Sequence, residues 1–150
     1  MQTVTLGKTG ITVNKNGFGA LPIQRISKDD AAYLLRKAFD NGIKYFDTAR
    51  FYTDSEEKMG YALSDLRDRI IIATKTAATN ATAFWKDLET SLSLLKTDFV
   101  DLYQFHNLAF CPKPDDGSGL YEAMLEAKQQ GKIRHIGFTN HRHNVAKEAI

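Results

Sequence analysis

Residues 43–75, IKYFDTARFYTDSEEKMGYALSDLRDRIIIATK, combine two β-like segments with a helix-like segment between them. The β-like segments, residues 43–49 and 70–75, are rich in β-branched and aromatic side chains. Between them, Ser55 is followed by Glu56 and Glu57, and acidic residues favour the positively polarised first turn of a helix. This order predicts a βαβ unit, whose two strands run parallel.

The same alternation continues on the C-terminal side of this unit. Strands are predicted at residues 99–105 and 133–138, and each is preceded by a helical stripe of apolar residues. One stripe consists of Phe84, Leu88, Leu92 and Leu95, and the other of Leu120, Ala123, Met124 and Ala127. A further helix begins near Val145. Repeats of about 30 residues predict a parallel α/β sheet. The polar segment 111–119 is either part of a lid or an ordinary loop between a strand and a helix.

On the N-terminal side, residues 4–13 alternate apolar and polar side chains around the turn 7–10 and predict a hairpin. A short apolar segment, residues 17–21, follows. Ser27 and Asp30 form a capping box, so a helix begins there, and Asn41-Gly42 ends it.

Composition excludes several classes of protein. The net charge is +2 with 25% charged residues, which gives no indication of a nucleic-acid-binding surface. No apolar run approaches the roughly 18 residues of a membrane span, and the N-terminus lacks a signal core. The only cysteine, Cys111, allows no internal disulfide and belongs to no metal motif. We therefore expect a cytoplasmic protein of one domain, with no resident metal.

Polar side chains gather where the predicted strands end. Asp47 ends one strand, with Tyr52 just beyond it, and Lys75 and His106 end the next two. Each has an ordinary structural interpretation, as a helix cap, a solvated cation or a packed ring. However, parallel α/β folds place their chemistry at the carboxyl ends of the strands, and four such residues at equivalent positions indicate a shared site.

These four residue types suit the reduction of a carbonyl group. A hydride that arrives at a carbonyl carbon leaves an alkoxide, which must be protonated as it forms. The hydroxyl of Tyr52 is a suitable acid, and the ammonium of Lys75 would stabilise the phenolate. Asp47 would keep that ammonium charged, and His106 would orient the carbonyl. Because none of them donates a hydride, an organic cofactor is implied.

The segments FDTARFY, IIATKT and DLYQFHN resemble the aldo-keto reductases, whose Asp, Tyr, Lys and His tetrad lies on a (β/α)8 TIM barrel. The resemblance places Asp47, Tyr52, Lys75 and His106 on that tetrad. It also implies NADP as cofactor and a small-molecule carbonyl compound as substrate. The N-terminal hairpin resembles the one that closes the bottom of that barrel, and residues 17–20 resemble its first strand.

The resemblance further implies a set of cofactor-binding residues, namely Gly19, Ala20, Asp47, Thr139 and Asn140. Thr139-Asn140 stands where the family has Ser-Asn, which holds the nicotinamide carboxamide. Segments 55–70 and 111–124 look most like prokaryotic members that carry a ferredoxin-like iron–sulfur tail, which would lie beyond Ile150.

A complete barrel of this kind needs about 250 residues. Residues 1–150 are therefore expected to be the N-terminal portion of one barrel domain, with the hairpin and about five β/α units. An open sheet exposes two edges and one face. We expect the chain to need the remaining strands or a second copy to complete the barrel, and to be weakly active or inactive alone.

Other functions fit parts of the pattern. A Schiff-base aldolase would use Lys75 as its nucleophile, but it would need that amine uncharged, and Asp47 opposes this. A non-catalytic nicotinamide-binding module and an inert fragment remain open. A metal site formed by His135, His141 and His143 is the least favoured, because no carboxylate or thiol joins them at ligand spacing.

Overall fold

The computed structural model describes residues 2–150. Its strands and helices follow the order β1 (Thr3–Thr5), β2 (Thr12–Asn14), β3 (Phe18–Gly19), α1 (Lys28–Asp40), β4 (Tyr45–Asp47), α2 (Ser55–Leu63), β5 (Ile71–Thr76), α3 (Ala81–Leu95), β6 (Val100–His106), α4 (Leu120–Gln129), β7 (Ile133–Thr139) and α5 (His143–Glu148). Two 3₁₀ helices, Leu21–Arg25 and Ser64–Arg69, lie before α1 and after α2.

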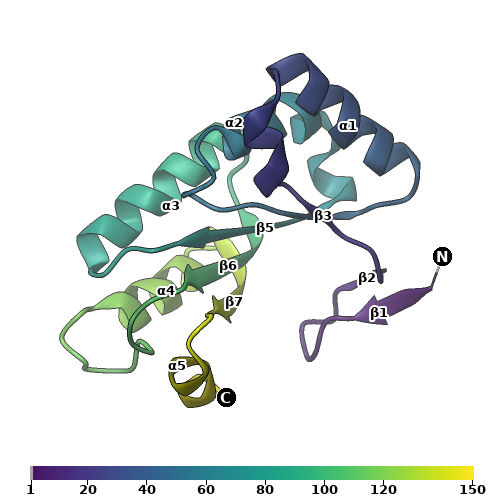
Figure 1. The fold of residues 1–150 in the computed structure, drawn as a ribbon. Helices are drawn as coiled ribbons and strands as arrows, with labels where there is room; N and C mark the ends of the chain where they lie inside the picture. Colours follow the sequence, from purple (N-terminus) through teal and green to yellow (C-terminus); the bar gives the residue numbers. More distant parts are fainter. Residues whose placement is uncertain (1) are drawn as a thin grey trace.

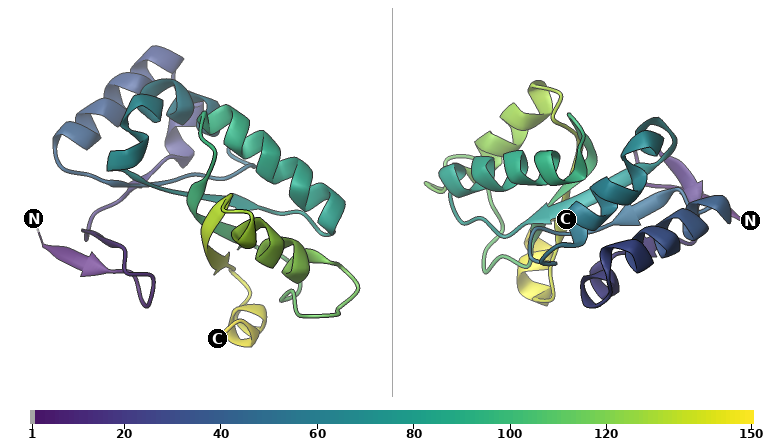
Figure 2. Two further views of the ribbon diagram at one scale, coloured as in Figure 1. Left: turned by 180° about the vertical axis from the view of Figure 1, so that it is seen from behind. Right: turned by 90° about the horizontal axis from the view of Figure 1, so that it is seen from above.

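A five-stranded parallel sheet forms the centre of the molecule, in the order β3-β4-β5-β6-β7. The strand order follows the chain order, and α1 to α4 lie on one side of the twisted sheet (Figures 1 and 2). A doubly wound sheet would reverse its strand order and carry helices on both faces. This arrangement is instead that of part of a (β/α)8 barrel, as predicted.

Helix starts follow local chemistry. Ser27 accepts a hydrogen bond from the Asp30 amide, so the predicted helix start is confirmed. The Asp30 carboxylate accepts from the Ser27 hydroxyl, whereas in a capping box it would accept from the Ser27 backbone N–H. Asn80 caps α3, as Ser27 caps α1, through the Ala83 amide. These caps satisfy backbone donors that the first turn of a helix leaves unpaired.

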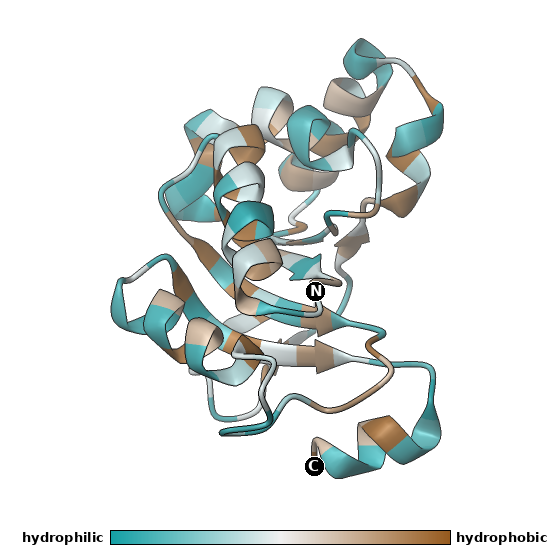
Figure 3. Ribbon diagram, turned by 90° about the vertical axis from the view of Figure 1, so that its left-hand side faces the viewer, coloured by the Kyte–Doolittle hydropathy of each residue, from teal (hydrophilic) through white to brown (hydrophobic). Residues whose placement is uncertain are grey.

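The hydrophobic core lies between the sheet and its helices. The four apolar residues predicted to form a stripe on α3 are all buried, and Phe84 packs edge-on against Tyr103 of β6. The α4 stripe is buried too. Figure 3 shows the corresponding mixture of hydrophobic and hydrophilic colour along each helix. The 3.6-residue period of apolar residues therefore identified the faces that pack on the sheet.

The hairpin and α5 lie at opposite ends of the sheet. β1 and β2 pair in antiparallel fashion, and residues of β2 line a hollow with residues that adjoin the amino ends of β5 and β6. This matches the predicted hairpin at the bottom of a barrel. α5 follows the carboxyl end of β7 (Figure 1). In residues 2–150, no helix is long and apolar enough to span a bilayer.

Two sequence-based boundaries are wrong. The strand expected at 43–49 is restricted to Tyr45–Asp47, because beyond Asp47 the chain turns away into the loop that carries Tyr52. Of residues 17–20, which were expected to form the first strand of the barrel, only Phe18–Gly19 are a strand, and Leu21 begins a 3₁₀ helix with Pro22 in its first turn. Proline favours that position because its missing N–H would be unpaired there in any case.

Candidate active site

The strand register brings three predicted site residues to one face. Asp47 pairs with Ala73, Lys75 pairs with Gln104, and His106 pairs with Thr139. Side chains of a strand alternate between faces with a period of two, so Ala73 and Lys75 share a face, as do Gln104 and His106. Asp47, Lys75 and His106 therefore point to the same side of the sheet, near the carboxyl ends of β4, β5 and β6.

A pocket of about 260 Å³ lies over this corner. Its lining consists of residues from the strand ends and from the loops that follow them: Asp47, Tyr52, Lys75, His106, Asn107, Thr139, Asn140 and His141. The four predicted catalytic residues thus share one pocket with Thr139 and Asn140, which were predicted to bind cofactor.

Lys75 is the most buried member of the pocket, with 5% of its surface exposed. Its Nζ donates to Asp47 Oδ1 over 2.5 Å and to the carbonyl oxygen of Thr48 over 2.7 Å. Gln104 Nε2 donates to the other carboxylate oxygen of Asp47 over 3.5 Å. A buried ammonium is costly unless it is paired and hydrogen-bonded, and here both conditions hold. The arrangement holds a cation at a defined point of the pocket.

Tyr52 reaches the pocket from the loop between β4 and α2. Its ring meets that of His106 edge to face, with ring centroids 5.7 Å apart and planes at 84°. The Nζ atom of Lys75 lies 5.1 Å from the centre of the Tyr52 ring. The tyrosine ring therefore lies close to both a cation and an imidazole. Tyr52 is one of the residues that line the pocket, where its side chain can meet a ligand.

His106 is shifted toward its neutral form. Burial lowers the pKa of His106 below its ordinary value of 6.5, and the positive charge of Lys75 lowers it further. The Asp47 carboxylate acts in the opposite direction, and His141 adds a smaller lowering. Near neutral pH the imidazole is therefore uncharged. A neutral imidazole carries one N–H donor and one acceptor, which suits it to hydrogen-bond a carbonyl oxygen without competing for its proton.

Thr139 and Asn140 border the pocket but are also used by the protein itself. Thr139 Oγ1 donates to the Phe105 carbonyl oxygen over 3.3 Å, and Asn140 Nδ2 donates to the Leu108 carbonyl oxygen over 2.7 Å. Asn140 Oδ1 accepts from the Arg142 amide over 2.7 Å. Both side-chain oxygens keep a lone pair that could accept from an amide group of a ligand.

Gly19 and Ala20 were also predicted to belong to the site, but in the part of the chain that the structure describes neither of them lines this pocket. Gly19 pairs with Asp47 at the end of β3, and a methyl group added at Gly19 would have open space around it. The Ala20 side chain is fully buried in the core, whereas its amide donates to the Asp47 carbonyl oxygen over 2.8 Å. Their predicted contact with a cofactor stays a prediction.

Three groups in or beside the site were not identified by the sequence analysis. Gln104 lies two residues before His106, so the period-two rule could have placed it on the same face. The Thr48 carbonyl group gives no signal in sequence. Glu56, interpreted only as a helix-start acid, is fully buried, pairs with Arg50, and accepts from Thr74 Oγ1 over 2.6 Å.

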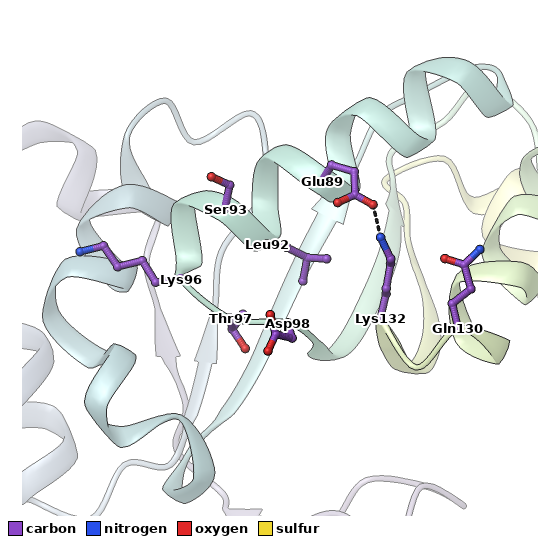
Figure 4. Close-up of a pocket in the computed structure, with 8 residues that line it drawn as sticks. All are labelled: Glu89, Leu92, Ser93, Lys96, Thr97, Asp98, Gln130 and Lys132. Carbon is purple, nitrogen blue, oxygen red and sulfur yellow. Dashed lines mark hydrogen bonds and ion pairs between the residues drawn. The ribbon is translucent and has the colours of Figure 1, made fainter.

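Other locations lack this chemistry. In residues 2–150, no group of three or more His, Cys, Asp or Glu side chains gathers as a metal site. A larger hollow of about 580 Å³ lies at the opposite, amino end of β6 and β7 (Figure 4). It includes the ion pair between Glu89 and Lys132, together with Lys96 and Asp98. Its charged groups are paired or on the surface, so it offers no comparable acid.

Comparisons with known proteins agree on one family. Residues 15–149 match the sequence model described as the Aldo/keto reductase family. L-galactose dehydrogenase of Arabidopsis thaliana is 36% identical over 149 residues, which cover 89% of this chain and 47% of that protein.

Solved structures give the same result. The aldo-keto reductase AKR11C1 of Bacillus halodurans, in its holo form, aligns with a TM-score of 0.86 at 31% identity, over 99% of this chain and 53% of that one. An aldo-keto reductase of Klebsiella pneumoniae in complex with NADPH aligns at 0.83 and 29% identity, over 97% of this chain and 52% of that one. The chain spans about half the length of the curated relatives it matches.

Proposed function

Because the chain belongs to the aldo/keto reductase family, we propose that its pocket is the catalytic centre of an NADPH-dependent oxidoreductase that reduces aldehydes or ketones to alcohols. The observation that carries this proposal is the meeting of Asp47, Tyr52, Lys75 and His106 around one hollow of about 260 Å³. A phenol, a paired ammonium and a neutral imidazole in one place form a complete system for protonating a nascent alkoxide.

Each side chain has a separate task in this proposal. Tyr52 gives the proton of its hydroxyl to the substrate oxygen. Lys75, held by Asp47 over 2.5 Å, supplies the positive charge that stabilises the phenolate left behind. His106, kept neutral by burial and by Lys75, donates a hydrogen bond that orients the carbonyl group.

NADP is the cofactor we propose, and the pocket fits one end of it. Pockets that enclose a drug-sized ligand measure about 300–1,000 Å³, so 260 Å³ suits a nicotinamide ring with a reacting carbonyl group but not a whole dinucleotide. Thr139 and Asn140 would receive the carboxamide, and the backbone of Gly19, at the end of β3, and of Ala20, the next residue, would approach the ring. When bound, the reduced nicotinamide supplies the hydride that no side chain can provide. The NADPH complex of the Klebsiella pneumoniae relative supports this choice.

The extent of the chain bears on its activity. The described sheet has β3 and β7 at its edges, and α1 to α4 cover one face of it. We propose that residues 1–150 complete a barrel either with further strands or with a second copy, and that the chain alone turns over carbonyl compounds weakly or not at all. A monodisperse monomer with the turnover of a complete relative would contradict this.

We also propose the cytoplasm as the location of the protein. Its only cysteine, Cys111, is free, which agrees with a reducing compartment.

Two alternatives fit less well. A Schiff-base aldolase needs an uncharged Lys75, whereas the structure gives this amine a carboxylate partner and a carbonyl acceptor. Reductive trapping of a carbonyl adduct on Lys75 with borohydride would favour the aldolase. A non-catalytic nicotinamide sensor would bind NADPH without oxidising it, and an inert fragment would do neither.

The deciding experiment replaces Tyr52 by Phe in the full-length protein and follows NADPH oxidation with 4-nitrobenzaldehyde. We expect kcat to fall by a factor of about 100 or more, as for loss of a general acid, while the Kd for NADPH changes by less than about twofold. The ring contacts to His106 and Lys75 persist in the variant, so a folding defect is not expected. If the variant kept more than about a tenth of kcat, equivalent to about 1.4 kcal/mol, Tyr52 would not be the acid.

A further inference from the structure

The loop that carries Tyr52 is fixed to β5 by its backbone. The Thr48 amide donates to the Ala73 carbonyl oxygen over 2.8 Å, and the Arg50 amide donates to the Lys75 carbonyl oxygen over 3.0 Å. These bonds extend the parallel ladder beyond the end of β4. They fix the chain up to Arg50, but Tyr52 lies two residues further on.

Beyond Arg50 the loop contains strain. Thr53, directly after Tyr52, has a φ angle of +42°, in the left-handed region that a β-branched residue rarely adopts. A residue persists in such a conformation only where its surroundings enforce it. The turn around it is closed by bonds from the Tyr52 amide to the Ala49 carbonyl oxygen and from the Ser55 amide to the Tyr52 carbonyl oxygen.

A buried ion pair connects this loop to β5 on the side away from the pocket. Arg50 Nη1 pairs with Glu56 Oε2, and Glu56 is fully buried whereas the Arg50 side chain is 20% exposed. The second carboxylate oxygen of Glu56 accepts a hydrogen bond of 2.6 Å from Thr74, the residue before Lys75. Glu56 therefore connects Thr74, the residue next to Lys75 on β5, with Arg50, which belongs to the loop that carries Tyr52.

Such a pair is poorly explained by stability alone. Burying two charges costs about as much as their attraction contributes, and an apolar pair of similar volume is often as stable. What a buried ion pair does provide is a defined geometry, and here the Glu56 carboxylate is also held by the hydrogen bond from Thr74. Here the pair connects the loop that carries Tyr52 with the strand that carries Lys75.

We propose that Arg50 and Glu56 are positioning residues that set the place of the Tyr52 hydroxyl relative to Lys75. This inference rests on the proposed function, because it requires Tyr52 to act as the acid. Neither residue is among those that line the pocket where a substrate would bind. Their effect is on the chemical step and not on cofactor binding.

The test uses the full-length protein with the double substitution Arg50→Met and Glu56→Gln. This variant leaves no unpaired buried charge, and the amide oxygen of the introduced glutamine can still accept from Thr74. The matched control is Glu57→Gln, which removes a carboxylate from the adjacent position of α2, where Glu57 pairs with Lys28 on the surface. Steady-state reduction of 4-nitrobenzaldehyde, the Kd for NADPH and the solvent deuterium isotope effect on kcat are measured for each.

We expect the double variant to lose at least tenfold in kcat, to keep its Kd for NADPH within twofold, and to show a larger solvent isotope effect. Glu57→Gln stays within twofold in every quantity. A double variant with kcat within threefold of the original protein overturns the proposal, as does a loss of kcat accompanied by an equal loss of NADPH affinity.

Should the double variant not fold, Arg50→Lys decides the matter. It keeps the charge but loses the planar fork of the guanidinium, so kcat falls at least threefold with the Kd for NADPH unchanged. An unchanged kcat overturns the proposal. The Tyr52→Phe variant, measured in parallel, separates the two hypotheses. If it stays active, the proposed function fails. If it is inactive while the Arg50 and Glu56 variants are normal, only the positioning role fails.

Discussion

Substitution of Gly60 by alanine tests how α2, which begins three residues after Tyr52, is held in place. Gly60 lies in α2 where it crosses α3. A methyl carbon at Gly60 would stand 2.0 Å from the Leu94 carbonyl oxygen and 2.9 Å from Leu95 Cα. These are backbone atoms, so no side chain can rotate out of the way. The two helices would have to separate by about 1 Å to reach an ordinary contact distance.

The expected cost combines two opposing effects. Overpacking of a core typically destabilises a protein by about 1–3 kcal/mol, and a clash with backbone belongs at or above the upper end of that range. Alanine in place of glycine contributes about 1 kcal/mol of stability through helix propensity. We therefore expect a net loss of about 2–3 kcal/mol, which corresponds to a fall in Tm of about 5–10 °C for a chain of this size.

Thermal unfolding followed by circular dichroism at 222 nm measures this change. Gly19→Ala is the matched control, because a methyl group there meets open space, and its Tm should stay within about 2 °C. Turnover of Gly60→Ala should also fall, since α2 carries Glu56 near its start. A Tm equal to or above that of the original protein would show that close contact between α2 and α3 does not depend on this glycine.

Three further substitutions have defined outcomes. Folding lowers the pKa of His106, so the unfolded chain binds this proton more readily and stability falls as the pH drops through about 6.5. Between pH 7.5 and 5.5 the original protein should lose more in Tm than His106→Gln, and an equal loss would exclude this contribution. Asp101 is fully buried and accepts from the Ile72 amide and from Arg67 and Arg134 over 2.8–3.0 Å. Asp101→Asn should cost about 3 kcal/mol in urea unfolding, and a cost below about 1 kcal/mol would show that the pairs contribute little. Gly19→Ala should weaken NADPH binding in fluorescence titration without a change in Tm, and unchanged affinity would remove Gly19 from the cofactor site.

Much of the fold could be predicted because its signals are local. The α3 stripe from Phe84 to Leu95 and the caps Ser27 and Asn41 depend on neighbours within one or two turns of helix, so sequence spacing is sufficient. The short strand β4 was overestimated because Thr48 and Ala49 have the same apolar or β-branched character as the strand before them. Only the hydrogen bonds of the loop distinguish Thr48 and Ala49 from the residues of the strand.

The site could be predicted where its residues lie at the carboxyl ends of strands. Asp47, Lys75 and His106 each occupy the last or next-to-last position of a strand, and a parallel sheet aligns those positions at one edge. Glu56 shows where this reasoning stops. A glutamate in a first helical turn is normally exposed, and only the tertiary structure places Arg50 and Thr74 against it.

The proposed catalytic geometry depends on fewer strands than the barrel does. Asp47, Lys75 and His106 lie on three adjacent strands, and the contacts that orient them come from Thr48 and Gln104 within the same strands and loops. Hydrogen-bond registers fix these strands relative to one another, whatever completes the remainder of the ring. Closure of the barrel would cover the face on which the pocket lies and exclude water from it, which strengthens each electrostatic contact. Loss of closure should therefore weaken cofactor binding and the chemical step while leaving the relative placement of Asp47 and Lys75 intact.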